Sequence, residues 1–322
     1  AGIRGAVWVA VRVPDDCISA HANQSRIHQF DMNDKENCMY SPDVVSFARE
    51  KGYFNGVNKD FSFSLAYAPL DFGARRFCEA RVWSYFNKFT DNGKEYLPYI
   101  EGKTDTPMPL FVKPKHKLSV QDVKDMMRDH YEGTPLDISN DFGAGPYKTP
   151  YRLSPLNFKV DDKEYFNERP ISTQQSGFVF VAQMRAHKPD PIGGVLWFGV
   201  DDANMAVFTP VYCCATKVPV CYTRVDGADY ITFSWNSAFW IFNWVSNMVY
   251  PRYNLMIGDV REAQKEMETT FNDAQEGIEE MAAKLLAKDK NAAVDFLTNY
   301  TNMTAQSTFD TWKQLGTFLI VK

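Results

Sequence analysis

The fold is decided by the stretch Gly177-Phe178-Val179-Phe180-Val181-Ala182-Gln183-Met184-Arg185, a run rich in aromatic and β-branched residues. Two similar runs follow it, Gly194-Val195-Leu196-Trp197-Phe198-Gly199-Val200 and Ala206-Val207-Phe208-Thr209-Pro210-Val211-Tyr212. Each run is short and bounded by turn residues, which is typical of strands. Strands that follow one another this closely pair as neighbours, so residues 171–233 are predicted to form an antiparallel meander.

Helical patterns flank this meander. From residue 234 the pattern is helical to the C-terminus, with weak points at Gly277 and at the polar stretch 288–291. The segments before residue 171 are predicted as follows: strands at 6–13 and 16–22 joined by the turn Pro14-Asp15, helices at 42–50, 73–86 and 119–131, surface loops at 87–117, and turns over 134–170. Such segregation of strands and helices predicts an α+β fold, with antiparallel sheet covered by helices.

Composition excludes several classes of protein. The chain has 322 residues, 45% of them apolar, and a net charge of -5, so it is a globular chain without the basic balance that captures nucleic acid. Its most apolar stretch, 234–250, contains three Asn and is shorter than the ~20 apolar residues that cross a bilayer. We therefore expect no membrane span and no nucleic-acid partner.

The first residues, Ala1-Gly2-Ile3-Arg4-Gly5, lack an initiator Met and lead directly into the apolar run at 6–13. We interpret this start as the sign of a piece of a longer polypeptide, either processed, clipped or with its front part not included. The sequence does not determine in which cellular compartment the protein lies, although an extracytoplasmic location is favoured over a cytoplasmic one.

The familiar catalytic and metal motifs do not occur in the sequence. Cys17 and His21 would lie about 13 Å apart on one strand, too far for a cysteine–histidine couple. The spacing of Asp137, Asn140 and Asp141 is that of turn-forming Asx residues rather than of a calcium loop, because a bidentate Glu is missing. The six cysteines match no zinc or redox spacing and are interpreted as structural thiols. We expect no metal and no cofactor.

Two clusters could carry chemistry. Asn23, in His21-Ala22-Asn23-Gln24-Ser25-Arg26, follows an apolar run and could offer its amide to an oxyanion, or could simply cap or turn the chain. In Asp71-Phe72-Gly73-Ala74-Arg75-Arg76-Phe77 two Arg begin a helix, and one that faces inward could bind a substrate carboxylate. The alternative is an ordinary surface arginine, which the spacing alone favours.

Three segments together resemble the PepD-type dipeptidases, a family of cysteine N-terminal-nucleophile hydrolases related to penicillin acylase and bile-salt hydrolase. The segments are Trp8-Val9-Ala10-Val11-Arg12-Val13-Pro14-Asp15-Asp16 leading to 21–24, Arg128-Asp129-His130-Tyr131-Glu132-Gly133-Thr134-Pro135-Leu136-Asp137, and Ile192-Gly193-Gly194-Val195-Leu196-Trp197-Phe198-Gly199-Val200-Asp201-Asp202-Ala203. The resemblance runs from the first residues to about residue 260.

The resemblance implies a four-layer αββα sandwich of antiparallel sheets, the N-terminal-nucleophile hydrolase fold, incomplete in this chain. Residues 1–260 would be the C-terminal part of that domain and 261–322 a helical extension. It also implies a dipeptidase in which an N-terminal Cys attacks the dipeptide carbonyl and its own amino group is the base. By similarity, Asn23 and Arg76 are predicted as catalytic residues, and Gln24 and His130 as substrate-binding residues.

The chain departs from this pattern at its start, because residue 1 is Ala and Cys17 has no free amine. We therefore expect the nucleophile on a separate N-terminal segment or chain, and this chain alone to be inactive. Two alternatives stay open: a non-catalytic binding or structural subunit of the same fold, and an acyl-amide hydrolase. The expected partners are the dipeptide and the segment that carries the Cys, and assembly into a homo-oligomer is left open.

Overall fold

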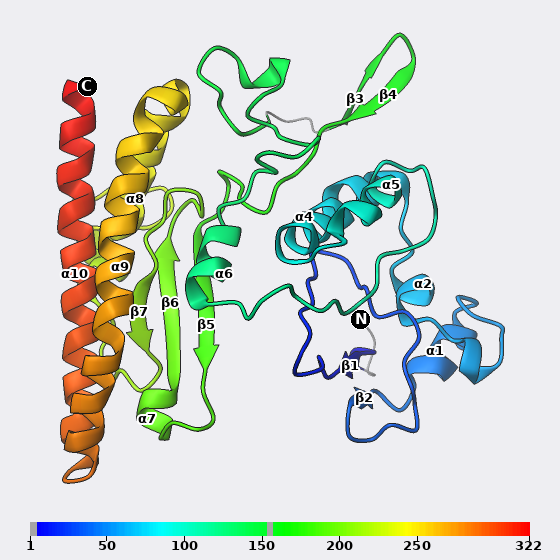
Figure 1. Ribbon diagram of the computed structural model, residues 1–322, viewed down its shortest axis with the longest axis horizontal. Helices are drawn as coiled ribbons and strands as arrows, with labels where there is room; N and C mark the ends of the chain where they lie inside the picture. Colours follow the sequence, from blue (N-terminus) through cyan, green and yellow to red (C-terminus); the bar gives the residue numbers. More distant parts are fainter. Residues whose placement is uncertain (1–4, 153–156) are drawn as a thin grey trace. The chain divides into compact units, whose positions relative to one another are not determined.

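The meander predicted at 171–233 is present in the computed structural model, which describes residues 5–152 and 157–322. Strands β5 (Phe178–Met184), β6 (Gly194–Val200) and β7 (Thr209–Tyr212) form one antiparallel sheet in that order (Figure 1). Val181 lies opposite Trp197, and Trp197 lies opposite Pro210. The prediction of an antiparallel meander is therefore confirmed, with a shorter last strand than the run 206–212.

The two faces of this sheet differ in burial. Successive side chains of a strand point to opposite faces. On one face Val181 and Trp197 are buried, while on the other Phe178 is 62% and Phe180 49% exposed. Phe178 stacks on Phe180 and on Phe198, so the exposed face is a continuous aromatic surface.

Helices cover the buried face. They are α8 (Ala238–Val249), α9 (Tyr253–Leu286) and α10 (Lys290–Val321), and α9 and α10 run side by side along the sheet (Figure 1). The helical prediction beyond residue 234 is confirmed. Gly277 does not interrupt α9; the break falls before Asp289, whose carboxylate accepts the N–H of Asn291 and begins α10. Gly316 is required by close approach, because a Cβ there would collide with the Trp244 ring.

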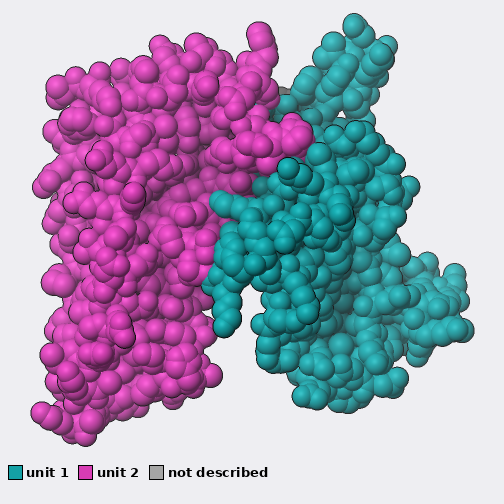
Figure 2. All heavy atoms as spheres, in the orientation of Figure 1, with its two compact units in different colours: residues 1–118, 152–170 teal, residues 119–151, 171–322 magenta. Residues whose placement is uncertain are grey.

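The chain divides into two compact units, shown in Figure 2. Unit 2, residues 119–151 and 171–322, holds the sheet and its helices. It also contains α6 (Val120–Met126), α7 (Asp190–Gly193) and the short 3-10 turns η4 (Phe142–Ala144), η5 (Val220–Tyr222), η6 (Val225–Gly227) and η7 (Tyr250–Arg252). The domain boundary predicted at residue 260 falls inside α9.

Helix α6 begins as the sequence predicts. The Ser119 hydroxyl accepts the N–H of Asp122, and the Asp122 carboxylate accepts the N–H of Ser119, which is a complete capping box. The helix ends at Met126, before the predicted Tyr131. It could not include the predicted end, because Tyr131 and Gly133 both adopt positive φ angles (66° and 72°).

Unit 1 comprises residues 1–118 and 152–170, of which 5–118, 152 and 157–170 are described. The prediction of two paired strands at 6–13 and 16–22 is wrong. Only β1 (Val9–Val11) forms, and its partner is the unpredicted β2 (Cys38–Tyr40). Between 16 and 22 a single bridge joins Ile18 to Val112, because the chain turns away after Pro14 instead of returning along β1.

The helices of unit 1 follow the predictions in part. Helix α1 (Val44–Glu50) forms, although Asp43 and not Ser41 stands at its N-cap. The helix predicted at 73–86 extends over 72–89 as α3 (Phe72–Ala74), the π-helical turn η2 (Arg75–Glu79) and α4 (Ala80–Phe89). The further elements are η1 (Asn58–Asp60), α2 (Phe63–Tyr67), η3 (Gly93–Tyr96) and α5 (Leu97–Ile100).

Two segments differ from the loops that were predicted. In 87–117 the short helices at 93–96 and 97–100 form and the side chains of Ile100 and Met108 are buried, whereas residues 102–107 are an exposed loop as predicted. In the turn-rich region a hairpin forms from β3 (Asn157–Val160) and β4 (Lys163–Phe166). Its turn residues Asp161 and Asp162 both have positive φ, as tight hairpins require.

The described part of the chain is thus a mixed α and β structure with antiparallel sheets. Among its helices, none combines the length and the apolar character that crossing a lipid bilayer demands.

Candidate functional site

A helix with a π-helical turn forms the base of the candidate site in unit 1. The Asp71 carboxylate accepts the N–H of Ala74 at 2.6 Å and begins α3. The turn η2 then widens the helix for one turn before α4 continues it. Such π-helical turns occur frequently at functional sites, because the extra residue changes which side chains share a face.

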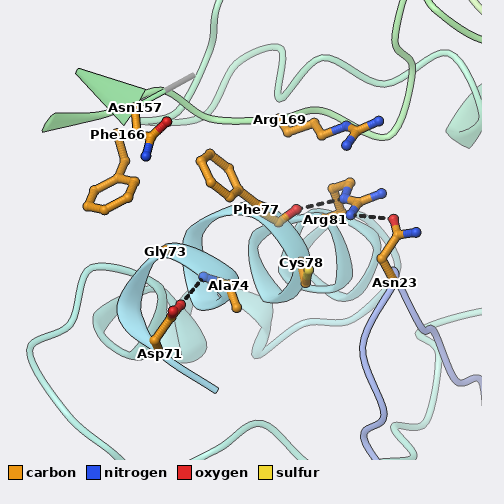
Figure 3. Close-up of a pocket in the computed structure, with 10 residues that line it drawn as sticks. All are labelled: Asn23, Asp71, Gly73, Ala74, Phe77, Cys78, Arg81, Asn157, Phe166 and Arg169. Atoms are coloured by element: carbon orange, nitrogen blue, oxygen red, sulfur yellow. Dashed lines mark hydrogen bonds between the residues drawn. The ribbon is translucent and has the colours of Figure 1, made fainter. Parts of the chain in front are cut away.

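This helix lines a pocket of about 640 Å³, which is in the size range of small-molecule sites. The lining residues come from three parts of unit 1: the turn at 23, the helix 71–81, and the hairpin β3–β4 with the residues after it (Figure 3). They are Asn23, Asp71, Gly73, Ala74, Phe77, Cys78, Arg81, Asn157, Phe166 and Arg169.

Asn23 and Arg81 meet at one end of the pocket. Asn23 has a φ of 57° and lies where the chain turns, as the turn-forming alternative predicts. It also lines the pocket. Arg81 donates from Nη2 to Asn23 Oδ1 at 2.9 Å and from Nε to the Phe77 carbonyl at 2.7 Å. These bonds orient the amide, so that Asn23 Nδ2 points away from Arg81 (Figure 3).

A buried ion pair holds the Asn23 turn against the helix. Arg26 and Glu79 pair at 2.9 Å, and both side chains are only 3% exposed. Arg26 also donates to the carbonyls of Ala20, Met108 and Pro109. Because Glu79 is part of the π-helical turn, this cluster fixes the turn and the loop relative to each other.

Arg76 and Gln24 have contacts outside the pocket lining. The Arg76 guanidinium forms an ion pair with Glu168 and donates to the Ile100 carbonyl at 3.3 Å. Gln24 donates its side-chain amide to the carbonyl of Ala68, at the end of α2. The arginine beside Asn23 is therefore Arg81, and the roles predicted for Arg76 and Gln24 stay predictions.

The cysteine–histidine couple has no support from the local contacts of Cys17. Its Sγ donates to the Asp16 carboxylate at 3.4 Å. Partial burial and the neighbouring Asp16 carboxylate raise the pKa of the Cys17 thiol, which disfavours the reactive thiolate.

His130 lies in unit 2, in a buried polar cluster. Its side chain is 1% exposed, and Nδ1 lies 3.1 Å from Glu132 Oε1. Burial alone would raise the pKa of Glu132, but the bonds with His130 outweigh it and hold the pKa below the usual value. Burial raises the pKa of Asp202 to about 6, although the hydrogen bond that the Tyr250 hydroxyl donates to its carboxylate acts to lower that pKa.

Arg128, in the second of the segments that carry the resemblance, connects that segment to α9 and to the residues just after the third segment. Arg128 forms a buried ion pair with Glu268 at 2.5 Å and donates to the Ala206 carbonyl at 2.9 Å. Residues 128–137 and the strand-end residues 201–206 are thereby held together by α9. The substrate-binding role of His130 stays a prediction, since its contacts are those of a buried structural network.

The acidic turn at 137–141 uses its side chains for local bonds, as the sequence predicts. Asp137 accepts from the N–H and hydroxyl of Ser139 and from the amide of Asn140. The Asp141 carboxylate accepts the N–H of Ala144 and begins η4.

Sequence reasoning missed Cys78, Arg81, Phe166 and Arg169 as pocket residues. Arg81 could have been found by helical periodicity, because it lies four residues after Phe77 on one helix. Phe166 and Arg169 had no such signal, since a hairpin far along the chain brings them to the pocket.

Comparison with known proteins gives the chain its family. The chain is 30% identical to a probable dipeptidase of Salmonella dublin over 65% of this chain and 42% of that protein. It is 26% identical to a probable dipeptidase of Latilactobacillus sakei over 92% of this chain and 55% of that protein, and 23% identical to dipeptidase A of Lactobacillus helveticus over 74% and 44%. The chain thus spans about half the length of the curated relatives that it matches.

The family model described as Peptidase family C69 matches residues 2–266, and its last matched residue lies in α9 near the predicted boundary at 260. With the dipeptidase-named relatives, this match bears out the resemblance to PepD-type dipeptidases. The chain belongs to peptidase family C69.

Proposed function

We propose that this chain is part of a cysteine-type dipeptidase and that the pocket of unit 1 is its substrate site. The observation that carries the proposal is the pair Asn23–Arg81 in that pocket, in a chain of a peptidase family. An amide held by a guanidinium is a rigid donor, as an oxyanion site requires.

In the proposed reaction, an N-terminal Cys on a preceding segment supplies the nucleophile. Its Sγ attacks the carbonyl carbon of the dipeptide, and its own α-amino group takes the thiol proton. Asn23 Nδ2 donates to the oxyanion, and Arg81 acts as a positioning residue that orients Asn23. The amine of the C-terminal amino acid leaves with the proton, and water then releases the acyl group from the sulfur.

In this proposal Arg76 and Gln24 act on the pocket indirectly, through the residues that they hold. Arg76 holds Glu168, which precedes the pocket residue Arg169. Gln24 holds the residue after Asn23 to the end of α2. Both side chains would therefore position the pocket, and His130 would stabilise unit 2 from its buried cluster.

The αββα sandwich is part of the proposal. Unit 2 supplies one sheet with helices on a single face, and the opposite face is aromatic and exposed. An apolar sheet face of this kind is normally covered, most simply by a second sheet about 10 Å away. We propose that a preceding segment completes that second sheet, because β1 and β2 have only three residues each.

The test is to isolate the native protein and determine its intact mass and N-terminal sequences. A polypeptide that begins with Cys, together with hydrolysis of dipeptides that stops after alkylation by iodoacetamide, is the expected result. A panel of dipeptides and acyl-amides separates a dipeptidase from an acyl-amide hydrolase. Absence of both the Cys-initiated polypeptide and hydrolysis would reject the enzyme in favour of a non-catalytic subunit.

A further inference from the structure

The sheet of unit 2 has two edges that differ in their hydrogen bonds. The strand order β5-β6-β7 places β5 at one edge and β7 at the other (Figure 1). In an antiparallel pair every second residue bonds to the neighbouring strand, and the residues between them direct their N–H and C=O groups to the other side. Each edge strand therefore has a row of backbone groups that face away from the sheet.

Helices α9 and α10 close the β7 edge with side-chain acceptors. Tyr212 donates its N–H to Thr301 Oγ1 of α10 at 3.2 Å. Phe208, directly before the strand, donates its N–H to Glu268 Oε1 of α9 at 3.0 Å. Between these two residues Pro210 has no N–H group at all. The alternate positions 208, 210 and 212 thus have no N–H left for another strand.

The β5 edge is open. Gly177 accepts the N–H of Asp201 at 2.9 Å, and Arg185 donates its N–H to Gly193 at 3.0 Å, so the odd-numbered residues from 177 to 185 bond to β6. The residues that direct their backbone groups outward are Phe178, Phe180, Ala182 and Met184. Within the described part of the chain, no group bonds to the N–H or C=O of these four residues.

Strand β5 also lacks the features that protect an edge from pairing. Edge strands are commonly protected by proline, by a charged side chain, by a bulge or by short length. The seven residues Phe178–Met184 contain neither proline nor charge, and each pairs with one residue of β6 without a bulge. The four outward residues also have exposed side chains. Such an edge is suited to the addition of another strand.

The sequence of β5 is complementary to itself. In an antiparallel pair with a copy of β5, related by a two-fold axis beside Val181, Phe178 lies opposite Met184 of the copy and Phe180 lies opposite Ala182 of the copy. This register uses every outward N–H and C=O group of both strands. A ring beside a thioether is a favourable pair, and no like charges are brought together because neither strand carries a charge.

We infer that two copies of this chain associate through β5, so that two three-stranded sheets form one six-stranded antiparallel sheet. The occupant of the edge is a second copy because the strand matches itself in hydrogen bonds, in side-chain size and in charge. The contact is one strand wide, at the low end of interface sizes, and we expect a dissociation constant of about 1–100 μM. The inference does not depend on the proposed function.

The test is sedimentation velocity of this 322-residue chain from about 1 to 200 μM, a range that should convert monomer into dimer. Ala182→Pro removes an outward N–H that β6 does not use, as an edge strand tolerates. Because the two-fold axis doubles the loss, the dissociation constant should rise at least about tenfold. The matched control Ala182→Val keeps the N–H and should dimerise like the unmodified chain.

A second measurement needs no variant that could misfold. Amide hydrogen exchange of the unmodified chain should slow with rising concentration at Phe180 and Ala182, while the N–H groups of Val179 and Val181 stay protected by β6 at every concentration. A chain that remains monomeric up to about 200 μM overturns the inference. A dimer in which exchange at Phe180 and Ala182 does not change also overturns it, because the contact then lies elsewhere.

Discussion

Asn23 combines an unusual backbone conformation with a fixed side chain. Its positive φ of 57° is one that Asn tolerates better than most residues, because its short side chain bonds locally. The bond from Arg81 then fixes which end of the amide accepts and which donates. The bond between Arg81 and Asn23 therefore holds the side-chain N–H group of Asn23 in one orientation.

Replacing Asn23 is expected to affect catalysis in the complete enzyme and not substrate affinity. Asn23→Ala lowers kcat by about 10²–10³-fold with little change in KM, as loss of one oxyanion donor does. Asn23→Gly gives the same loss without backbone strain, because Gly adopts positive φ freely. Steady-state kinetics of both variants, with the exposed Asn299→Ala as control, measure this; an unchanged kcat removes Asn23 from the mechanism.

Lys124 is a charged side chain with no exposed surface. Its Nζ lies 3.5 Å from the centroid of the Trp197 ring and 2.9 Å from Asn272 Oδ1. Burial lowers the pKa of Lys124 to about 7, although Glu268 opposes the shift. The groups that face it include Asp125 and Arg128 on its own turn of chain and Glu268 on α9.

This burial makes stability depend on pH. Between pH 7 and 10.5 the unfolded chain binds a proton at Lys124 that the folded chain does not, so stability rises with pH by up to about 1.4 kcal/mol per unit. Lys124→Met therefore stabilises the protein most near pH 7, and the gain shrinks as the pH rises. Urea unfolding at pH 7.5 and 9.5 measures the difference. The exposed Lys284→Met should show no such trend, and a gain that is constant with pH would contradict the shift.

At the scale of elements, the sequence predicted those helices and strands whose ends are determined by hydrogen bonds between residues close together in the chain. The capping box of α6 and the turn residues around the strands β5–β7 are encoded within a few residues, and both were predicted. The pairing of β1 with β2 and the hairpin β3–β4 were missed, because β2 has only three residues and β3 and β4 only four each, which is too short for an apolar pattern to stand out from its surroundings. The π-helical turn η2 had no local signature either, and the buried pair Arg26–Glu79 stabilises it from outside the helix.

The capping box gives a measurable contribution. Ser119→Ala removes the acceptor for the Asp122 N–H, and it is expected to lower the free energy of unfolding by about 1 kcal/mol. The denaturation midpoint should fall at constant m-value. Ser307→Ala, at an exposed position inside α10, is expected to be neutral or slightly stabilising because Ala favours helix. Equal effects of the two changes would show that capping contributes nothing here.

At the scale of the whole molecule, the sequence predicted the fold class and the family, whereas the pocket required the structure. Asn23 was selected because it follows an apolar run, and it does line the pocket. Arg76 was predicted by similarity, from the Ala-Arg-Arg-Phe run, and Arg81 was not considered. The pair of Arg76 with Glu168 depends on a segment about ninety residues later that no pattern in the sequence connects to it. Contacts between distant segments are the part that periodicity cannot supply.

The exposed aromatic face of the sheet offers a test of assembly. Phe180→Lys places a charge on that face and is expected to reduce, at least about tenfold, the dipeptidase activity recovered when the chain is combined with the proposed Cys-bearing segment. Circular dichroism of the variant should match that of the wild type, since Phe180 is already half exposed. Ile320→Lys, exposed on α10, is the control. Full recovery with Phe180→Lys would mean that the face is not covered on assembly.

The path of the chain through the two units has a consequence for biosynthesis. The ribosome completes the helix 72–89 early, but the pocket wall from Asn157 to Arg169 emerges only after residues 119–151, which belong to the other unit. Unit 1 therefore cannot complete its fold until residues 119–151, the first part of unit 2, have been translated. Nascent chains arrested before residue 170 should lack the ligand-binding surface even where every upstream helix has already formed.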